Sequence, residues 1–232
     1  MDKGRIRLLA GAIAGLTVIA GIAAYFTSDD TVTNAFVASA LNISIIEPNW
    51  VQDQTIVPEQ QVVKDPYIVN TDNTPAYVFM EVTVPAVTVT VEESANNNSK
   101  GTALAEKKVP LFRFVTKEGS YATDPLDTAQ LTNTGWYRMA GYPKLTADGS
   151  AYTYLYAYTG SGDGSNMAVL EPRTTTVKPL FNKVLFCNAR EDDTLPGSRQ
   201  KIDIKAYGIQ SEHLKSSDET ETDAEKIWQL LT

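Results

Sequence analysis

The chain carries its strongest fold signal in VVKDPYIVNTDNTPAYVFMEVTVPAVTVTV, residues 62–91. Every second residue from Val78 to Val84 is valine or methionine, and this period of two predicts a β-strand with one buried face. The alternation changes phase at Pro85, where the missing backbone N–H predicts a β-bulge or an edge. The turn-forming run 70–75 joins this strand to the short run 67–69, which predicts an antiparallel hairpin.

The composition is that of an acidic globular protein. Hydrophobic residues make up 43% of the 232 positions, which is enough to build a sizeable core. The formal charge is −8, and removal of residues 1–24, whose net charge is +2, leaves −10. Such a chain is not expected to bind nucleic acid, since phosphate binding needs clustered Lys and Arg. The single cysteine, Cys187, cannot form an internal disulfide and is expected to be a buried apolar side chain.

The N-terminus has the pattern of a secretory signal peptide. A basic start with Lys3, Arg5 and Arg7 precedes an uncharged apolar run over residues 8–24 that ends in small residues. We expect cleavage after Ala23 or Ala24. An uncleaved membrane anchor is the competing interpretation, although the run is short for a bilayer span. Contact with a membrane is expected only through this uncleaved signal peptide.

The remaining chain predicts an all-β fold with a short C-terminal helix. Further strand-like runs lie at 41–46, 111–115, 135–139, 152–158, 184–187 and 202–206. Because no βαβ alternation is present, we expect one antiparallel β-sandwich over residues 38–232. The polar, asparagine-rich stretch 92–108 predicts an inserted exposed loop.

The helix is expected at about 223–231. Thr222 and Glu225 match a capping box, in which each side chain binds a backbone N–H of the first turn. Four apolar residues then share one face at helical spacing, so the helix should dock on the sheet through Trp228. These residues are Ala224, Ile227, Trp228 and Leu231.

Four tyrosines fall on one face of a single predicted strand. They are Tyr152, Tyr154, Tyr156 and Tyr158. In register, such side chains form an aromatic ladder. The ladder is a candidate surface for binding sugars or for stacking on a neighbouring molecule, and cross-strand packing on a half-exposed sheet face is the alternative.

The residues that enzymes commonly use are sparse. The one histidine, His213, cannot form a two-histidine metal site, and no HExxH, G-x-S-x-G, phosphate-loop or EF-hand pattern is present. We therefore expect no catalytic residues, no metal site and no cofactor. The acidic runs 191–193 and 218–223 could attract Ca²⁺ weakly, and solvated surface charge explains them as well.

Several segments together resemble the TasA/camelysin family of exported bacterial proteins. They are AAYFTSDD (23–30), ALNISIIEPNW (40–50), VPEQQVVKDPYIVNTDNTPAYVFMEV (57–82), TTTVKPLFNKV (174–184), IDIKAYGIQSEHL (202–214) and the Ala-x-x-x-Trp helix (224–228). The resemblance implies processing by a SipW-type signal peptidase and a jelly-roll β-sandwich. It also implies assembly into extracellular fibres of a bacterial biofilm matrix, on the cell surface or secreted.

The expected mechanism is donation of a strand from the N-terminus. Residues 25–37 are β-prone and have no adjacent hairpin partner, so once released they could add to the sheet edge of a neighbouring copy. Because this contact joins two different surfaces, it would propagate into a filament. The candidate donor residues are Tyr25, Phe26, Val32, Ala35, Phe36 and Val37.

Two other functions stay open from the sequence. The first is a non-polymerising adhesin or polysaccharide-binding module that uses the tyrosine ladder. The second is a secreted metallopeptidase, a function described for some camelysin relatives, although one histidine supplies few zinc ligands. Partners are expected to be further copies of this chain and the signal peptidase, with room for an accessory matrix protein.

Overall fold

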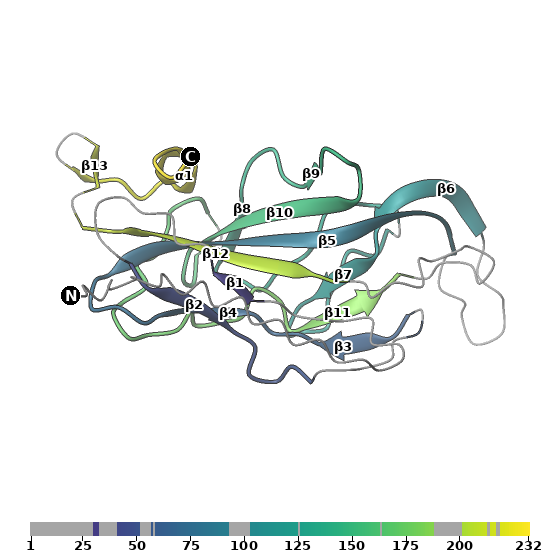
Figure 1. Ribbon diagram of the computed structural model, residues 1–232, viewed down its shortest axis with the longest axis horizontal. Coiled ribbons are helices and arrows are strands. Elements are labelled where there is room, and N and C mark those ends of the chain that lie inside the picture. The colour runs from purple at the N-terminus through teal and green to yellow at the C-terminus, as the bar shows by residue number, and fades with distance from the viewer. Residues whose placement is uncertain are drawn as a thin grey trace, which may run out of the picture.

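The described part of the chain is all-β with one short helix (Figure 1). The computed structural model describes residues 30–32, 41–51, 57, 59–92, 103–124, 126–162, 164–187, 201–212, 214–216 and 219–232. The elements are β1 Asp30–Val32, β2 Ile43–Ile46, β3 Gln61–Val63, β4 Tyr67–Asn70, β5 Ala76–Glu92, β6 Ala103–Pro110, β7 Phe112–Val115, β8 Trp136–Arg138, β9 Lys144–Leu145, β10 Ala151–Tyr158, β11 Lys183–Phe186, β12 Asp203–Gln210, β13 Lys215–Ser216, β14 Glu219–Thr220 and α1 Ala224–Gln229.

The larger sheet is built around β5. Its strand order is β1-β12-β5-β10-β8, with β6 paired to β5 and β9 paired to β10. Both β12 and β10 run antiparallel to β5, whereas β1 runs parallel to β12. Val78, Met80, Val82 and Val84 of β5 share one face, as the alternation predicts, and all four are fully buried. The expected single buried face is wrong for the first half of the strand, because Tyr77 and Phe79 on the opposite face are buried in a second apolar cluster with α1.

A second layer lies below this sheet in Figure 1. It contains the three-stranded sheet β3-β11-β7 and the pair β2-β4. The chain before β11 lies beside both β3 and β4, because Lys64 N donates to Asn182 O and Thr176 N donates to Ile68 O. These bonds join the two small sheets into one continuous layer.

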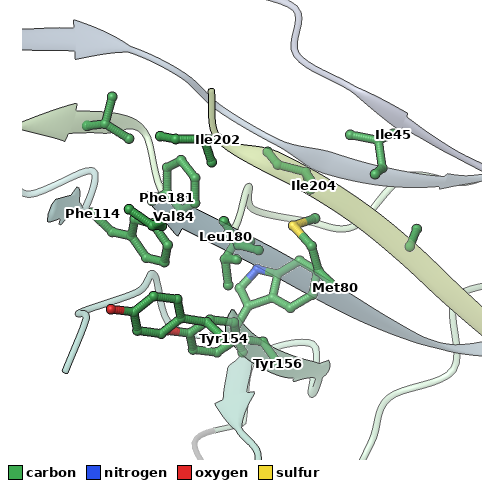
Figure 2. Packing of buried hydrophobic residues seen from close by; sticks show 14 of the residues in the cluster. Ile45, Met80, Val84, Phe114, Tyr154, Tyr156, Leu180, Phe181, Ile202 and Ile204 are labelled. Atoms are coloured by element: carbon green, nitrogen blue, oxygen red, sulfur yellow. The ribbon is translucent and has the colours of Figure 1, made fainter. Parts of the chain in front are cut away.

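The main apolar core lies between the two layers (Figure 2). Phe114 of the second layer stacks on Phe181 with ring centroids 4.2 Å apart, and it contacts Tyr154 of the first layer at 5.4 Å. Cys187 belongs to this cluster and is buried, as predicted. The hydrophobic area removed from water here is the main stabilising contribution to the fold.

The C-terminal helix covers part of the outer face of the larger sheet. Trp228 packs against Phe79 of β5 and Tyr207 of β12 at centroid distances of 5.0 and 5.2 Å. The predicted docking through Trp228 is therefore confirmed. The predicted capping box is wrong, because Asp223 is the N-cap and accepts hydrogen bonds from the N–H groups of Glu225 and Lys226. Its short carboxylate reaches two orphan donors of the first turn.

The hairpin expected between residues 67–69 and the long strand is also wrong. β4 pairs with β2 in the second layer, so the turn 70–75 carries the chain from one layer to the other. Asn70 holds this turn from inside, since its side-chain N–H groups donate to Thr74 O and Leu170 O and its Oδ1 accepts from Asp72 N. The sequence of the turn does not distinguish these two connections.

Two details of β5 differ from expectation. The ladder with β10 runs through Pro85 without a bulge, and the register shift lies further on, between Thr90 and Glu92. Pro85 marks the change of partner along β5, because the first residue of β12 lies opposite Thr83 and the last residue of β6 lies opposite Ala86. The loop expected at 92–108 is shorter, because β6 already begins at Ala103.

Candidate functional site: the covered edge of β12

β12 has the two-faced pattern that its sequence predicts. Ile204 and Ala206 are buried in the main core, whereas Asp203, Lys205 and Tyr207 are half-buried on the opposite face. Lys205 forms an ion pair with Glu81 of β5 at 3.4 Å. An ion pair with this exposure adds little stability, so β12 is held mainly by its inward side chains and its ladder with β5.

The outward edge of β12 is covered by the N-terminal segment. β1 lies parallel to it with Asp30 opposite Ile204, Thr31 opposite Lys205 and Val32 opposite Ala206. The ladder with β5 continues in a hydrogen bond from Ser211 N to Pro75 O, so odd-numbered residues of β12 bond to β5. By alternation, the backbone groups of Ile204 and Ala206 face β1.

This covered edge lies at the seam between the two layers. β12 contacts β2 of the second layer as well as β5, and β1 contacts β2. A side chain at Gly208 would place its Cβ 2.6 Å from Leu41 Cδ2 and 3.1 Å from Ile43 Cδ1. Glycine therefore lets β2 approach the inner face of β12 closely, just beyond the three residues that β1 covers.

The structure describes one of the six candidate donor residues. Val32 is the last residue of β1, and it is placed on β12 of its own chain. Tyr25, Phe26, Ala35, Phe36 and Val37 lie outside the described residues. The pairing of β1 with a strand from the far end of the chain is a contact that sequence reasoning missed, because it predicted no partner for this segment.

The tyrosine ladder faces the main core and not the solvent. Tyr154, Tyr156 and Tyr158 are buried, and Tyr152 is half-buried, so these residues do not form the candidate exposed surface. The alternative, packing across strands, holds, but on a covered face and not on a half-exposed one. Leu155 and Ala157 on the other face of β10 are buried as well. Both faces of this strand are covered, and the alternation of its residues could not show that neither face is exposed.

The hydroxyl groups of this ladder mostly fix loops. Tyr152 donates to Lys108 O, Tyr154 donates to Thr128 O at 2.7 Å, and Tyr158 accepts from Val177 N. The Tyr156 hydroxyl is buried without a hydrogen-bond partner among the described residues. Burial raises the pKa of both Tyr154 and Tyr156, so their hydroxyls stay protonated across the physiological range.

A buried ion pair joins two of the sequence segments that carry the family resemblance. Lys64 Nζ lies 2.8 Å and 3.0 Å from the two carboxylate oxygens of Glu47, with side-chain exposures of 0% and 5%. The same ammonium lies 4.8 Å from the centroid of the Trp50 ring. Next to them, Asn49 donates its backbone and side-chain N–H to Asp65. These contacts anchor the chain after β2 beside the chain after β3.

The described residues do not gather into a metal site. No group of three or more His, Cys, Asp or Glu side chains is close enough there to hold an ion. His213 and the acidic run 191–193 lie outside this part of the chain. Among the helices in the described ranges, none has the length and apolar character to cross a bilayer.

Comparisons with known proteins do not identify the chain. No family model, no curated protein and no solved structure matches it.

Proposed function

We propose that this chain is a structural subunit of extracellular biofilm-matrix fibres. In this proposal the N-terminal segment of one copy adds to the β12 edge of the next copy. The sheets form a jelly-roll-like β-sandwich, the signal peptide is removed by a SipW-type peptidase, and the released subunits assemble outside the bacterial cell. The principal partner is a further copy of the same chain, and an accessory matrix protein could start the fibre.

The observation that carries the proposal is the pairing of β1 with β12. A segment of three residues from one end of the chain lies at the outermost position of the larger sheet, in parallel with a strand near the other end. Strand addition uses this kind of contact, in which main-chain hydrogen bonds supply affinity. Since every copy carries the same segment, the segment of a neighbour can make the same bonds.

Two further properties favour a fibre subunit over the alternatives. Acidic chains repel one another in solution, which keeps unassembled subunits soluble until strand addition joins them. The tyrosine ladder, on which the polysaccharide-binding alternative depended, is largely buried and offers little contact area to a glycan. The motif resemblance to the TasA/camelysin family supports the same choice.

The first experiment compares residues 25–232 with residues 38–232 by negative-stain microscopy and sedimentation. We expect fibres from the longer chain and monomers from the shorter chain. Monomers from both chains, over a range of pH and salt, would contradict spontaneous assembly and favour a non-polymerising surface module.

A second experiment asks whether the segment crosses from one copy to another. Chains of 25–232 with Thr31→Cys are mixed with chains carrying Lys205→Cys, two positions that face each other in the observed register. Adjacent strand positions lie within the Cα separation that a disulfide spans. Mild oxidation should then give covalent dimers of the two chains. A Thr31→Cys chain mixed with Asp148→Cys, on an exposed loop, is the matched control, and equal yields in both mixtures would contradict strand exchange.

A further inference from the structure

We propose that the side-chain amide of Gln130 closes the β7 edge of the second layer against strand addition. The inference rests on the proposed function and adds to it a device that directs assembly. β7 is the terminal strand of the sheet β3-β11-β7, so one row of its backbone groups faces away from β11. An unpaired edge of this kind is a template for another strand.

Gln130 occupies this edge with both ends of its amide. Its Oε1 accepts from Phe114 N at 2.8 Å, and its Nε2 donates to Phe112 O at 3.1 Å. The remaining N–H of the amide donates to the Tyr154 hydroxyl at 3.3 Å. Gln130 itself is 5% exposed, so water has little access to these bonds.

The amide reproduces the contact that a parallel strand would make. In a parallel ladder, one residue donates its N–H to the C=O of the residue before its partner, and its C=O accepts from the N–H of the residue after its partner. Gln130 does the same around Arg113, through Phe112 O and Phe114 N. The N–H and C=O of Thr31 are aligned in this way with Ile204 and Ala206, on either side of Lys205. The same edge pattern is thus filled by a side chain at β7 and by a backbone segment at β12.

The loop that carries Gln130 is fixed at both ends. At its start, Arg113 of β7 donates to Ala122 O. At its end, the Asn133 side chain donates to Pro179 O and accepts from Lys117 N at 2.9 Å. These anchors hold the amide against β7 and give it little freedom to leave.

The larger sheet has β8 at the end opposite to β1, and this edge is protected in a different way. β8 spans three residues and ends in the exposed Arg138. Short edges with a charged side chain are poor templates for strand addition. β7 is longer and all four of its residues are buried, so its edge needs an explicit closure.

The test measures binding of a fluorescent synthetic peptide, DDTVTNAFV, which copies residues 29–37. Full mature chains of 25–232 are titrated as Gln130→Ala and, for the matched control, as Gln229→Ala at an exposed position of α1. Fluorescence anisotropy gives the number of peptides bound per chain. We expect Gln130→Ala to bind one more equivalent than the control, because the side-chain amide no longer occupies the β7 edge and the Phe114 N–H loses that acceptor. Equal stoichiometry in two folded variants would overturn the proposal.

A second variant and a hydrogen-exchange measurement complete the test. If Gln130→Ala does not fold, Gln130→Met keeps the side-chain volume and should give the same extra equivalent. In the unmodified chain, hydrogen exchange at the Phe114 amide should be unchanged by assembly, and a rise in protection would show that assembly uses the β7 edge. Absence of the 31–205 crosslink between cysteine variants that keep Gln130 would contradict the proposed function, whereas a crosslink without an extra peptide in Gln130→Ala would contradict this inference alone.

Discussion

The β7 and β12 edges carry the same backbone pattern and are closed by groups of very different origin. At β7 the closing group is the Gln130 side chain, 16 residues along the chain from Phe114. At β12 it is a three-residue strand from the opposite end of the chain. A nearby side chain has a high effective concentration at its edge, whereas a distant segment must close a long loop. The Gln130 side chain is therefore expected to stay on the β7 edge of its own chain. The β1 segment is the closing group that copies of the chain could exchange.

The second layer also contains a remote contact that does not close a strand edge, the buried ion pair between Lys64, just after β3, and Glu47. We expect the largest loss of stability when this pair is broken. Glu47→Ala removes the carboxylate that neutralises the buried ammonium, and we expect a loss of about 3–5 kcal/mol in the free energy of unfolding. Urea denaturation measures it. The double variant Glu47→Leu with Lys64→Met should recover most of this loss, since neither charge of the pair remains, and a double variant as unstable as the single one would contradict the explanation.

The next largest effect is expected at β7. Gln130→Ala leaves Phe114 N–H and Phe112 C=O without their amide partner, at a cost of about 3 kcal/mol in the free energy of unfolding. The same denaturation experiment on Gln229→Ala should change the free energy by less than about 0.5 kcal/mol. If the two variants were equally stable, the β7 edge would not depend on the amide.

At β12 the expected loss is one of assembly and not of folding. Thr31→Pro removes the N–H that faces Ile204, and we expect about a tenfold lower affinity between subunits. The critical concentration for pelletable fibres measures this change. The free energy of unfolding of the monomer should fall by less than about 1 kcal/mol, because water reaches the edge once β1 leaves. Thr31→Val keeps the N–H and should assemble normally, so failure of this control would point to a side-chain effect.

The smallest effect concerns the outer face of β12 at high pH. Burial, and then the neighbouring Glu81 carboxylate, raise the pKa of Tyr207 to about 12 from an ordinary value near 10. The unfolded chain therefore loses this proton first, and stability should decline as pH rises from about 10 to about 12. Thermal unfolding over that range measures the decline. Tyr207→Phe should make it shallower, and an unchanged slope would assign the decline to other groups.

The sequence predicted best which side chains of a strand point into the main core. The inward residues of β5 and β12 follow from alternation alone, and Trp228 follows from helical spacing. The tyrosine ladder was misplaced because α1 covers the second face of β10, so neither face is exposed. A period of two does not tell an inner from an outer face when both are apolar.

The parts that sequence reasoning missed depend on contacts between distant residues. Asn70 turns the chain between layers by bonding to Leu170 O, a hundred residues away. Gln130 and Glu47 are ordinary polar residues until the fold brings an edge or an ammonium next to them. β6 was assigned to a loop because its composition is polar, and its strand forms by pairing with the threonine- and valine-rich half of β5.

The contact between β1 and β12 has a consequence at the scale of a whole filament. Because each joint would unite two different surfaces of the chain, every subunit in a line would point the same way. One end of the filament would present an uncovered β12 edge, and the other would present an N-terminal segment that covers no neighbour. These two ends would bind incoming subunits at different rates. A fibre of this protein would therefore elongate faster at one end than at the other.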